Sequence, residues 1–283
     1  FPTRRSSDLN CGIGVAPIRE EKKQELIDYL GTRIIGTIPT KLELHWNTMQ
    51  EYFDYLTENS PAVNVVAYVA QGPVRINEMG FSKEPATLEQ LKNMKLEVRK
   101  AMEAGCVALS SGLVYLPGAY TKKEEMAELC KELIPYNGYY ISHIRDEGDE
   151  EMEALDEAIH IAKTAGVPLH ISHLKVMGHK NFGTIDEVFK KLDEAEADGL
   201  EVTFDCYPYT AGMTSLGALL PPWAFEGGVE NMVKRLEVQE NRDRIIKELE
   251  EGIPGWQCFY QLAGGWNGVV LASVMTEANK YVE

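Results

Sequence analysis

Residues 139–176 read YYISHIRDEGDEEMEALDEAIHIAKTAGVPLHISHLKV, and their pattern is the clearest indication of the fold class. An apolar run, YYISHIR, precedes an acidic amphipathic segment that ends at Gly166, and a second apolar run, PLHISHLKV, follows it. Short apolar runs on either side of a helical segment are typical of two parallel strands joined by a crossover helix. The stretch therefore predicts one complete strand–helix–strand unit.

The same unit recurs along the chain. Further apolar runs are NVVAYVAQGPVR, CVALSSGLVY and LEVTFDCYPY, and helical segments occupy 87–105, 121–138 and 184–199. These three helical segments open with the capping-box pattern at Thr87, Thr121 and Thr184. We expect a parallel sheet covered by helices, which fits an open doubly wound sheet and a closed (β/α)8 barrel alike. No nucleotide-binding glycine motif follows any of the predicted strands.

The chain divides into four predicted segments. Residues 1–9, FPTRRSSDL, have no regular period and resemble a translated sequencing adapter, so we interpret them as a foreign leader, with a natural disordered N-terminus as the alternative. Residues 10–209 form the predicted barrel, and the run LNCGIGVAP at its start predicts a strand that leads into a loop. The Gly- and Pro-rich opening of 210–275 predicts an inserted, lid-like subdomain, with a charged helix over 229–252. Residues 276–283 end inside a helical pattern without a cap, so we expect an internal fragment of a longer protein.

Composition excludes several classes of partner. The formal net charge of −16 disfavours nucleic acid and anionic membranes, because both require basic patches. No apolar run approaches the length of about 18 residues that a membrane-spanning helix needs. The five cysteines lack C-x-x-C spacing, which favours a reducing compartment, and we expect a cytoplasmic protein.

Two histidines follow the same Ile-Ser phrase at the ends of consecutive predicted strands. In a parallel barrel the carboxyl ends of neighbouring strands converge at one mouth, so His143 and His173 are expected to lie close together. Two imidazoles in this arrangement favour a zinc site, although a lone strand histidine is more often a structural residue. His170 is expected on the opposite face of the strand, in a structural role.

Six motifs carry a resemblance to a known family: LNCGIGVAP, ALSSGLVYLPGAY, YYISHIRDE, ISHLKVMGHKNFG, DCYPYTAGMTSLGALLPPW and GWNGVVLAS. In this order they resemble the N-acyl-D-amino-acid deacylases (D-aminoacylases) of the amidohydrolase superfamily, over residues 10–283. The resemblance implies an incomplete metal-dependent-hydrolase (β/α)8 TIM barrel. It also implies that Cys11 is a zinc-ligating thiolate beside His143 and His173. Without it, Cys11 would be interpreted as a small buried residue before a turn.

The resemblance also implies a substrate pocket. Lys175 would pair with the free carboxylate of an N-acyl amino acid, Tyr209 and Ser215 would help to hold it, and Tyr115 would line the pocket. The alternatives are a solvated lysine and tyrosines that only pack in the pocket wall. The family's catalytic Asp has no match here, so no catalytic residue is assigned and the fragment itself is expected to be inactive.

The resulting hypothesis is a Zn²⁺-dependent hydrolase that cleaves the small-molecule amide of an N-acyl-D-amino acid into a D-amino acid and a carboxylate. Two alternatives remain open. One is a related cyclic-amide hydrolase of the hydantoinase or dihydroorotase kind, which usually bridges two metals with a carboxylated lysine. The other is a non-catalytic, vestigial barrel.

Overall fold

The computed structural model describes residues 5–31 and 43–272 of the chain. Its strands are β1 (Arg5–Asp8), β2 (Asn64–Ala67), β3 (Val69–Ala70), β4 (Ala108–Gly112), β5 (Tyr139–His143), β6 (Leu169–Ile171) and β7 (Val202–Phe204). Its helices are α1 (Lys23–Gly31), α2 (Met49–Asn59), α3 (Gln71–Met79), α4 (Leu88–Ala104), α5 (Lys123–Cys130), α6 (Glu151–Ala165), α7 (Ile185–Ala197), α8 (Val229–Glu237), α9 (Gln239–Glu251) and α10 (Phe259–Leu262), with short 3-10 turns between them.

All described strand pairs are parallel. β1 pairs with β2, and a second sheet has the order β3-β4-β5-β6-β7. Only Tyr68 separates β2 from β3, so the two sheets are continuous through one interrupted strand. The predicted parallel α/β architecture is therefore confirmed, with six strand positions among the described residues, consistent with an incomplete (β/α)8 barrel.

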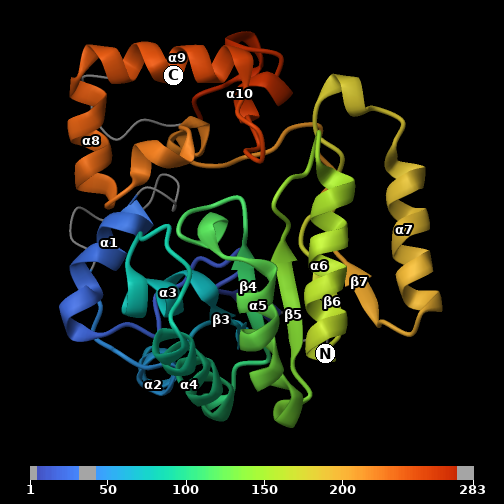
Figure 1. The fold of residues 1–283 in the computed structure, drawn as a ribbon. Coiled ribbons are helices and arrows are strands. Elements are labelled where there is room, and N and C mark those ends of the chain that lie inside the picture. Colours follow the sequence, from blue (N-terminus) through green and yellow to red (C-terminus); the bar gives the residue numbers. More distant parts are fainter. Residues whose placement is uncertain (1–4, 32–42, 273–283) are drawn as a thin grey trace.

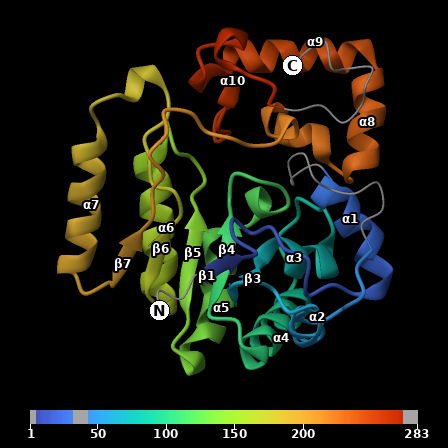
Figure 2. The same ribbon diagram turned by 180° about the vertical axis from the view of Figure 1, so that it is seen from behind.

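The two faces of the sheet are filled differently. On the outer face, strand residues such as Leu109, Tyr140 and Leu169 pack with the buried sides of the helices in one large core. On the inner face, Tyr68, Ala108 and Ile141 form a separate, small hydrophobic cluster. Figures 1 and 2 show α7 with β7 at one end of the sheet and α1 with α2 at the other. Helices thus cover one face, as in a barrel wall.

The described part of residues 210–275 lies across the carboxyl ends of the strands (Figure 1). It contacts the barrel loops through Leu262 of α10, whose methyl groups lie against Gly148 and Gly178. A Cβ on either glycine would come within 3.0 Å of these methyl groups, so either substitution would displace the Leu262 side chain. The segment is therefore placed above the mouth of the sheet, and its assignment as a separate subdomain stays a prediction. Residues 273–283 lie outside the described residues.

Three details of local structure differ from the sequence predictions. The run NVVAYVAQGPVR is strand only as far as Ala70, because α3 begins at Gln71 with Pro73 in its first turn, where a missing N–H costs no helical bond. The strand expected at LNCGIGVAP is displaced to Arg5–Asp8, inside the predicted leader, and left-handed residues follow it. The charged helix predicted over 229–252 breaks at Val238 into α8 and α9.

Of the three predicted capping boxes, only the one at Thr87 is confirmed. Thr87 forms one with Gln90 as predicted. Thr121 instead accepts a hydrogen bond from the side chain of Gln71, and the hydroxyl of Thr184 donates to the carbonyl of Asn181. Within the described ranges, no helix is both long enough and apolar enough to cross a membrane.

Candidate metal centre

Cys11 lies in a tight turn that follows β1. Leu9, Cys11 and Gly12 all have left-handed backbones, with φ angles of 68°, 55° and 69°. The buried hydroxyl of Ser110 in β4 fixes this turn, because it donates to the Leu9 carbonyl at 2.6 Å and accepts from the Gly12 amide at 3.3 Å. A Cβ at Gly12 would lie 2.7 Å from the backbone nitrogen of Gly112, so only glycine fits. The turn thus presses the Cys11 backbone against the end of β4.

His143 is the last residue of β5 and is only 4% exposed. The ring of Tyr115 meets its imidazole edge-on, with centroids 4.9 Å apart. The ring of His173 meets it in the same way at 4.4 Å. Packing from two sides therefore holds the imidazole of His143 at the carboxyl end of the sheet.

His173 does not lie on a strand, contrary to the prediction. β6 ends at Ile171, which pairs with Ser142, so Ser172 and not His173 lies level with His143. A left-handed backbone at His173, with φ of 42°, turns its side chain back toward the mouth. Such a conformation costs a non-glycine residue about 1–3 kcal/mol and persists only where surrounding contacts impose it. Here the Asp205 carboxylate accepts from the His173 amide at 2.6 Å.

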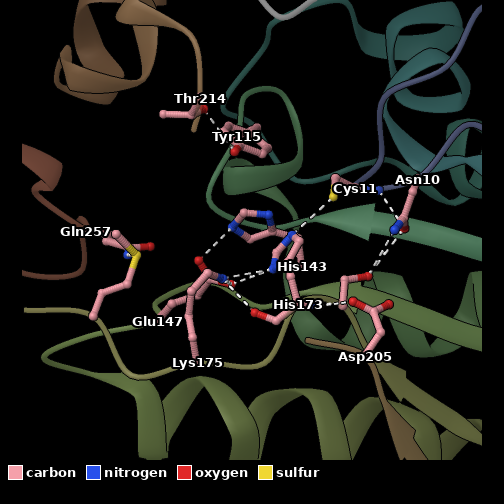
Figure 3. Close-up of polar contacts among 12 residues, drawn as sticks. Asn10, Cys11, Tyr115, His143, Glu147, His173, Lys175, Asp205, Thr214 and Gln257 are labelled. Atoms are coloured by element: carbon pink, nitrogen blue, oxygen red, sulfur yellow. Dashed lines mark hydrogen bonds and ion pairs between the residues drawn. The ribbon is translucent and has the colours of Figure 1, made fainter. Parts of the chain in front are cut away.

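The three side chains converge at one point (Figure 3). Cys11 Sγ lies 3.4 Å from His173 Nε2, and one ligand atom from each of Cys11, His143 and His173 lies within 4.8 Å of the others. Zinc bonds of about 2.0–2.3 Å place tetrahedral donors at similar separations, and a thiolate with two imidazoles is a donor set that zinc favours. The residues present therefore fit a single metal ion.

Burial controls the protonation of Cys11. Burial is the largest cause, and the Glu147 and Asp205 carboxylates act in the same direction while Lys175 opposes them. Together they raise the pKa of the thiol to about 12. Without a metal the thiol is therefore protonated at neutral pH. A cation between the sulfur and the imidazoles would have to displace that proton, so metal affinity at this site should increase with pH.

Glu147 is a member of the site that the sequence analysis did not single out. It is 3% exposed, and its carboxylate lies 3.5 Å from His143 Nε2, 2.8 Å from His173 Nδ1 and 2.5 Å from Lys175 Nζ. Burial would raise its pKa, but the imidazoles and the Lys175 ammonium outweigh burial and lower it to about 2. The motif YYISHIRDE contains Glu147, yet only the fold of its loop shows that the carboxylate returns to the histidines.

Of the residues predicted to bind substrate, some lie beside the candidate metal centre and others do not. Lys175 reaches the site, but its ammonium donates to Glu147 and to the His173 carbonyl, the latter at 2.7 Å. Lys175 does not lie on a strand, because β6 ends four residues before it. The ring under Lys175 is that of Tyr207, 5.4 Å away, whereas Tyr209 is 75% exposed.

Tyr115 and Ser215 lie on either side of the junction between the barrel and the segment above it. The Tyr115 hydroxyl is 3.1 Å from Thr214 Oγ1, so the pocket wall next to His143 is tied to residue 214 (Figure 3). Ser215 is the next residue, and its hydroxyl is buried without a hydrogen-bond partner among the described residues. These positions suit a wall and roof of a pocket, and their roles stay predictions.

A parallel α/β sheet with converging thiol and imidazole groups at its carboxyl mouth is typical of metal-dependent hydrolases on a (β/α)8 barrel. No family model matches the chain. D-aminoacylase from Alcaligenes xylosoxydans xylosoxydans is 34% identical over 207 residues, which are 73% of this chain and 41% of that protein.

Two solved structures agree with this relationship. A D-aminoacylase described as having a binuclear metal centre has a TM-score of 0.66 and 30% identity, covering 76% of this chain and 44% of the other. N-acyl-D-glutamate deacylase from Bordetella bronchiseptica, solved with zinc and a phosphonate inhibitor, has a TM-score of 0.63 and 28% identity, covering 72% and 41%. The chain is thus a homologue of the N-acyl-D-amino-acid deacylases, as its motifs predict, and spans about 40% of the curated relative's length.

Proposed function

We propose that this chain is part of a zinc-dependent hydrolase that cleaves the amide bond of N-acyl-D-amino acids, releasing a D-amino acid and a carboxylate. The observation that carries the proposal is the convergence of Cys11, His143 and His173 at the carboxyl ends of parallel strands. The relatives named D-aminoacylase and N-acyl-D-glutamate deacylase support the choice of substrate class.

Cys11, His143 and His173 would hold the metal ion. Zinc bound there would polarise the amide carbonyl and activate water at neutral pH. Glu147 orients the imidazole of His173 through Nδ1, which leaves Nε2 facing Cys11. A carboxylate behind a ligating histidine is a common arrangement, because it fixes the ring and increases its basicity.

Lys175 is the cation proposed to receive the carboxylate of the substrate. Its ammonium lies beside the histidines, and its contacts with Glu147 and the His173 carbonyl define where it points. Substrate would have to replace one of these contacts. The same ion pair with Glu147 disfavours the cyclic-amide alternative, because a carboxylated Lys175 would be an anion facing a carboxylate.

The experiment is an assay of the complete reading frame that contains this chain. We expect hydrolysis of N-acetyl-D-methionine or N-acetyl-D-glutamate but not of the L-enantiomers, with activity lost on chelation and restored by zinc. Cys11→Ser should abolish the activity, whereas the matched control Cys206→Ser, at an exposed cysteine, should retain it. A complete protein that cleaves only cyclic amides, or retains full activity as Cys11→Ser, would refute the proposal.

A further inference from the structure

A chain of hydrogen bonds crosses from β7 to β6 and ends at the backbone of His173. Thr203 Oγ1 lies 2.8 Å from His170 Nδ1, and His170 Nε2 lies 2.9 Å from Asp205 Oδ2. The other oxygen of Asp205 accepts from the His173 amide at 2.6 Å. His170 and Asp205 are therefore linked to a candidate metal ligand, although neither offers an atom to the metal group itself.

With His170 in its neutral form, the chemistry of the three side chains sets the direction of each of these hydrogen bonds. An ionised carboxylate only accepts, so His170 donates its proton from Nε2 to Asp205. Neutral His170 then has Nδ1 free as an acceptor, and the Thr203 hydroxyl donates to it. Asp205 is consequently held on both oxygens, one by His170 and one by the His173 amide.

The position of His170 shows why this restraint matters. His170 is paired with Ile141 of β5, whose side chain belongs to the inner-face cluster. Residues paired across neighbouring strands point to the same face, so the side chain of His170 lies on the inner face of the sheet. Side chains three residues apart on an extended strand point to opposite faces. An extended continuation of β6 would therefore place His173 on the outer face, away from Cys11. The left-handed turn at His173 reverses that direction, and Asp205 binds the amide of the turned residue.

We propose that His170 and Asp205 are positioning residues for the metal centre, which hold the turn that points the imidazole of His173 at Cys11. The proposal rests on the proposed function, because it takes Cys11, His143 and His173 as the ligands. It assigns to His170 a role beyond that of a strand residue. It also assigns to Asp205, which follows β7, a structural role that does not involve substrate.

The test is cobalt binding to the 283-residue chain, which carries all three candidate ligands. Cobalt affinity is measured by competition with a chelator, and the thiolate-to-cobalt charge-transfer absorption reports whether Cys11 ligates. We expect Asp205→Ala and His170→Ala to weaken binding by about 10–100-fold, the range found when partners of metal ligands are removed. The control His160→Ala, at an exposed histidine of α6, should stay within twofold of the unaltered chain.

Asp205→Asn separates position from charge. Its amide oxygen can accept from the His173 amide while its nitrogen donates to His170, which then carries its proton on Nδ1 and donates to Thr203. We therefore expect Asp205→Asn to stay within threefold of the unaltered chain. Affinity as weak as that of Asp205→Ala would overturn the positioning role in favour of a charge effect.

Folding of each variant is checked by circular dichroism. If the alanine variants do not fold, Thr203→Val tests the proposal instead. It removes only the hydroxyl that begins the series of hydrogen bonds, and the shape of the side chain stays nearly the same. It should weaken binding two- to fivefold, and an unchanged affinity would overturn the proposal. Failure of the unaltered chain to bind cobalt would overturn the proposed metal site as well. Normal cobalt binding by folded His170→Ala and Asp205→Ala would overturn the positioning role alone.

Discussion

Replacing Glu147 by Gln should destabilise the metal-free protein strongly, because Glu147 is the buried counter-charge of the site. Its carboxylate contacts Lys175 at 2.5 Å and His173 at 2.8 Å while only 3% of the residue is exposed. Removing one partner of a buried ion pair costs about 3–5 kcal/mol. Since the Lys175 side chain is 22% exposed, we expect the lower end, roughly 3 kcal/mol.

The lowered pKa of Glu147, which has the same contacts as its cause, corresponds to a similar magnitude. The pKa of Glu147 falls from 4.5 to about 2 on folding, and each pKa unit corresponds to about 1.4 kcal/mol. A lowered pKa contributes stability that is fully present above the unfolded value and is lost as the pH falls through the folded value. The difference between the unaltered chain and Glu147→Gln should therefore be roughly 3 kcal/mol at pH 7 and shrink to about 1 kcal/mol at pH 3.

Urea unfolding in the presence of a chelator, at both pH values, measures this difference. Glu153→Gln is the matched control, because Glu153 is an exposed acid in the first turn of α6, and it should change stability by less than about 0.5 kcal/mol. A Glu147→Gln effect below about 1 kcal/mol at pH 7, or one that does not change with pH, would refute this view of the buried charges.

Three further predictions concern the turn at Cys11, the segment above the barrel and activity. Gly12→Ala should lower the free energy of unfolding by at least about 2 kcal/mol, because φ is 69° and the new Cβ would lie 2.7 Å from the Gly112 nitrogen. An unchanged midpoint of urea unfolding would contradict the left-handed turn described at Cys11 and Gly12. Leu262→Ala should lower the free energy of unfolding by about 2 kcal/mol and speed amide hydrogen exchange in residues 256–268, because the Leu262 methyl groups fill the space at Gly148 and Gly178. Unchanged exchange would show that contacts other than those of Leu262 hold α10 in place. The 283-residue chain should show no appreciable deacylase activity even with zinc, because it spans only 41% of the length of the curated D-aminoacylase that it matches. Turnover within tenfold of a full-length relative would contradict this.

The sequence predicts the fold through repetition. Alternating apolar runs and amphipathic segments require parallel strands with crossover helices, and the strands that carry the Ile-Ser-His phrases are indeed parallel neighbours. The boundaries are less predictable. The strand at Arg5–Asp8 has no sequence period of its own, and only its pairing with β2, about sixty residues away, identifies it.

The candidate site is predictable in its donor residues but not in its backbone. His143 ends its strand as expected, whereas His173 reaches the site through a left-handed turn that histidine seldom adopts. Nothing in the local sequence signals this turn, since it depends on Asp205, which lies 32 residues further along. Glu147 is not predictable as a member of the site for a similar reason, because its contacts form only when the loop after β5 folds back.

X-ray absorption at the zinc edge shows whether Cys11, His143 and His173 hold one metal ion. The chain is loaded with one equivalent of zinc, and the scattering shell is compared with that of Cys11→Ser. We expect one sulfur at about 2.3 Å and nitrogen neighbours at about 2.0–2.1 Å from the zinc ion, with the sulfur absent in the variant. A zinc ion surrounded only by nitrogen and oxygen in the unaltered chain, or a chain that retains no zinc, would contradict it.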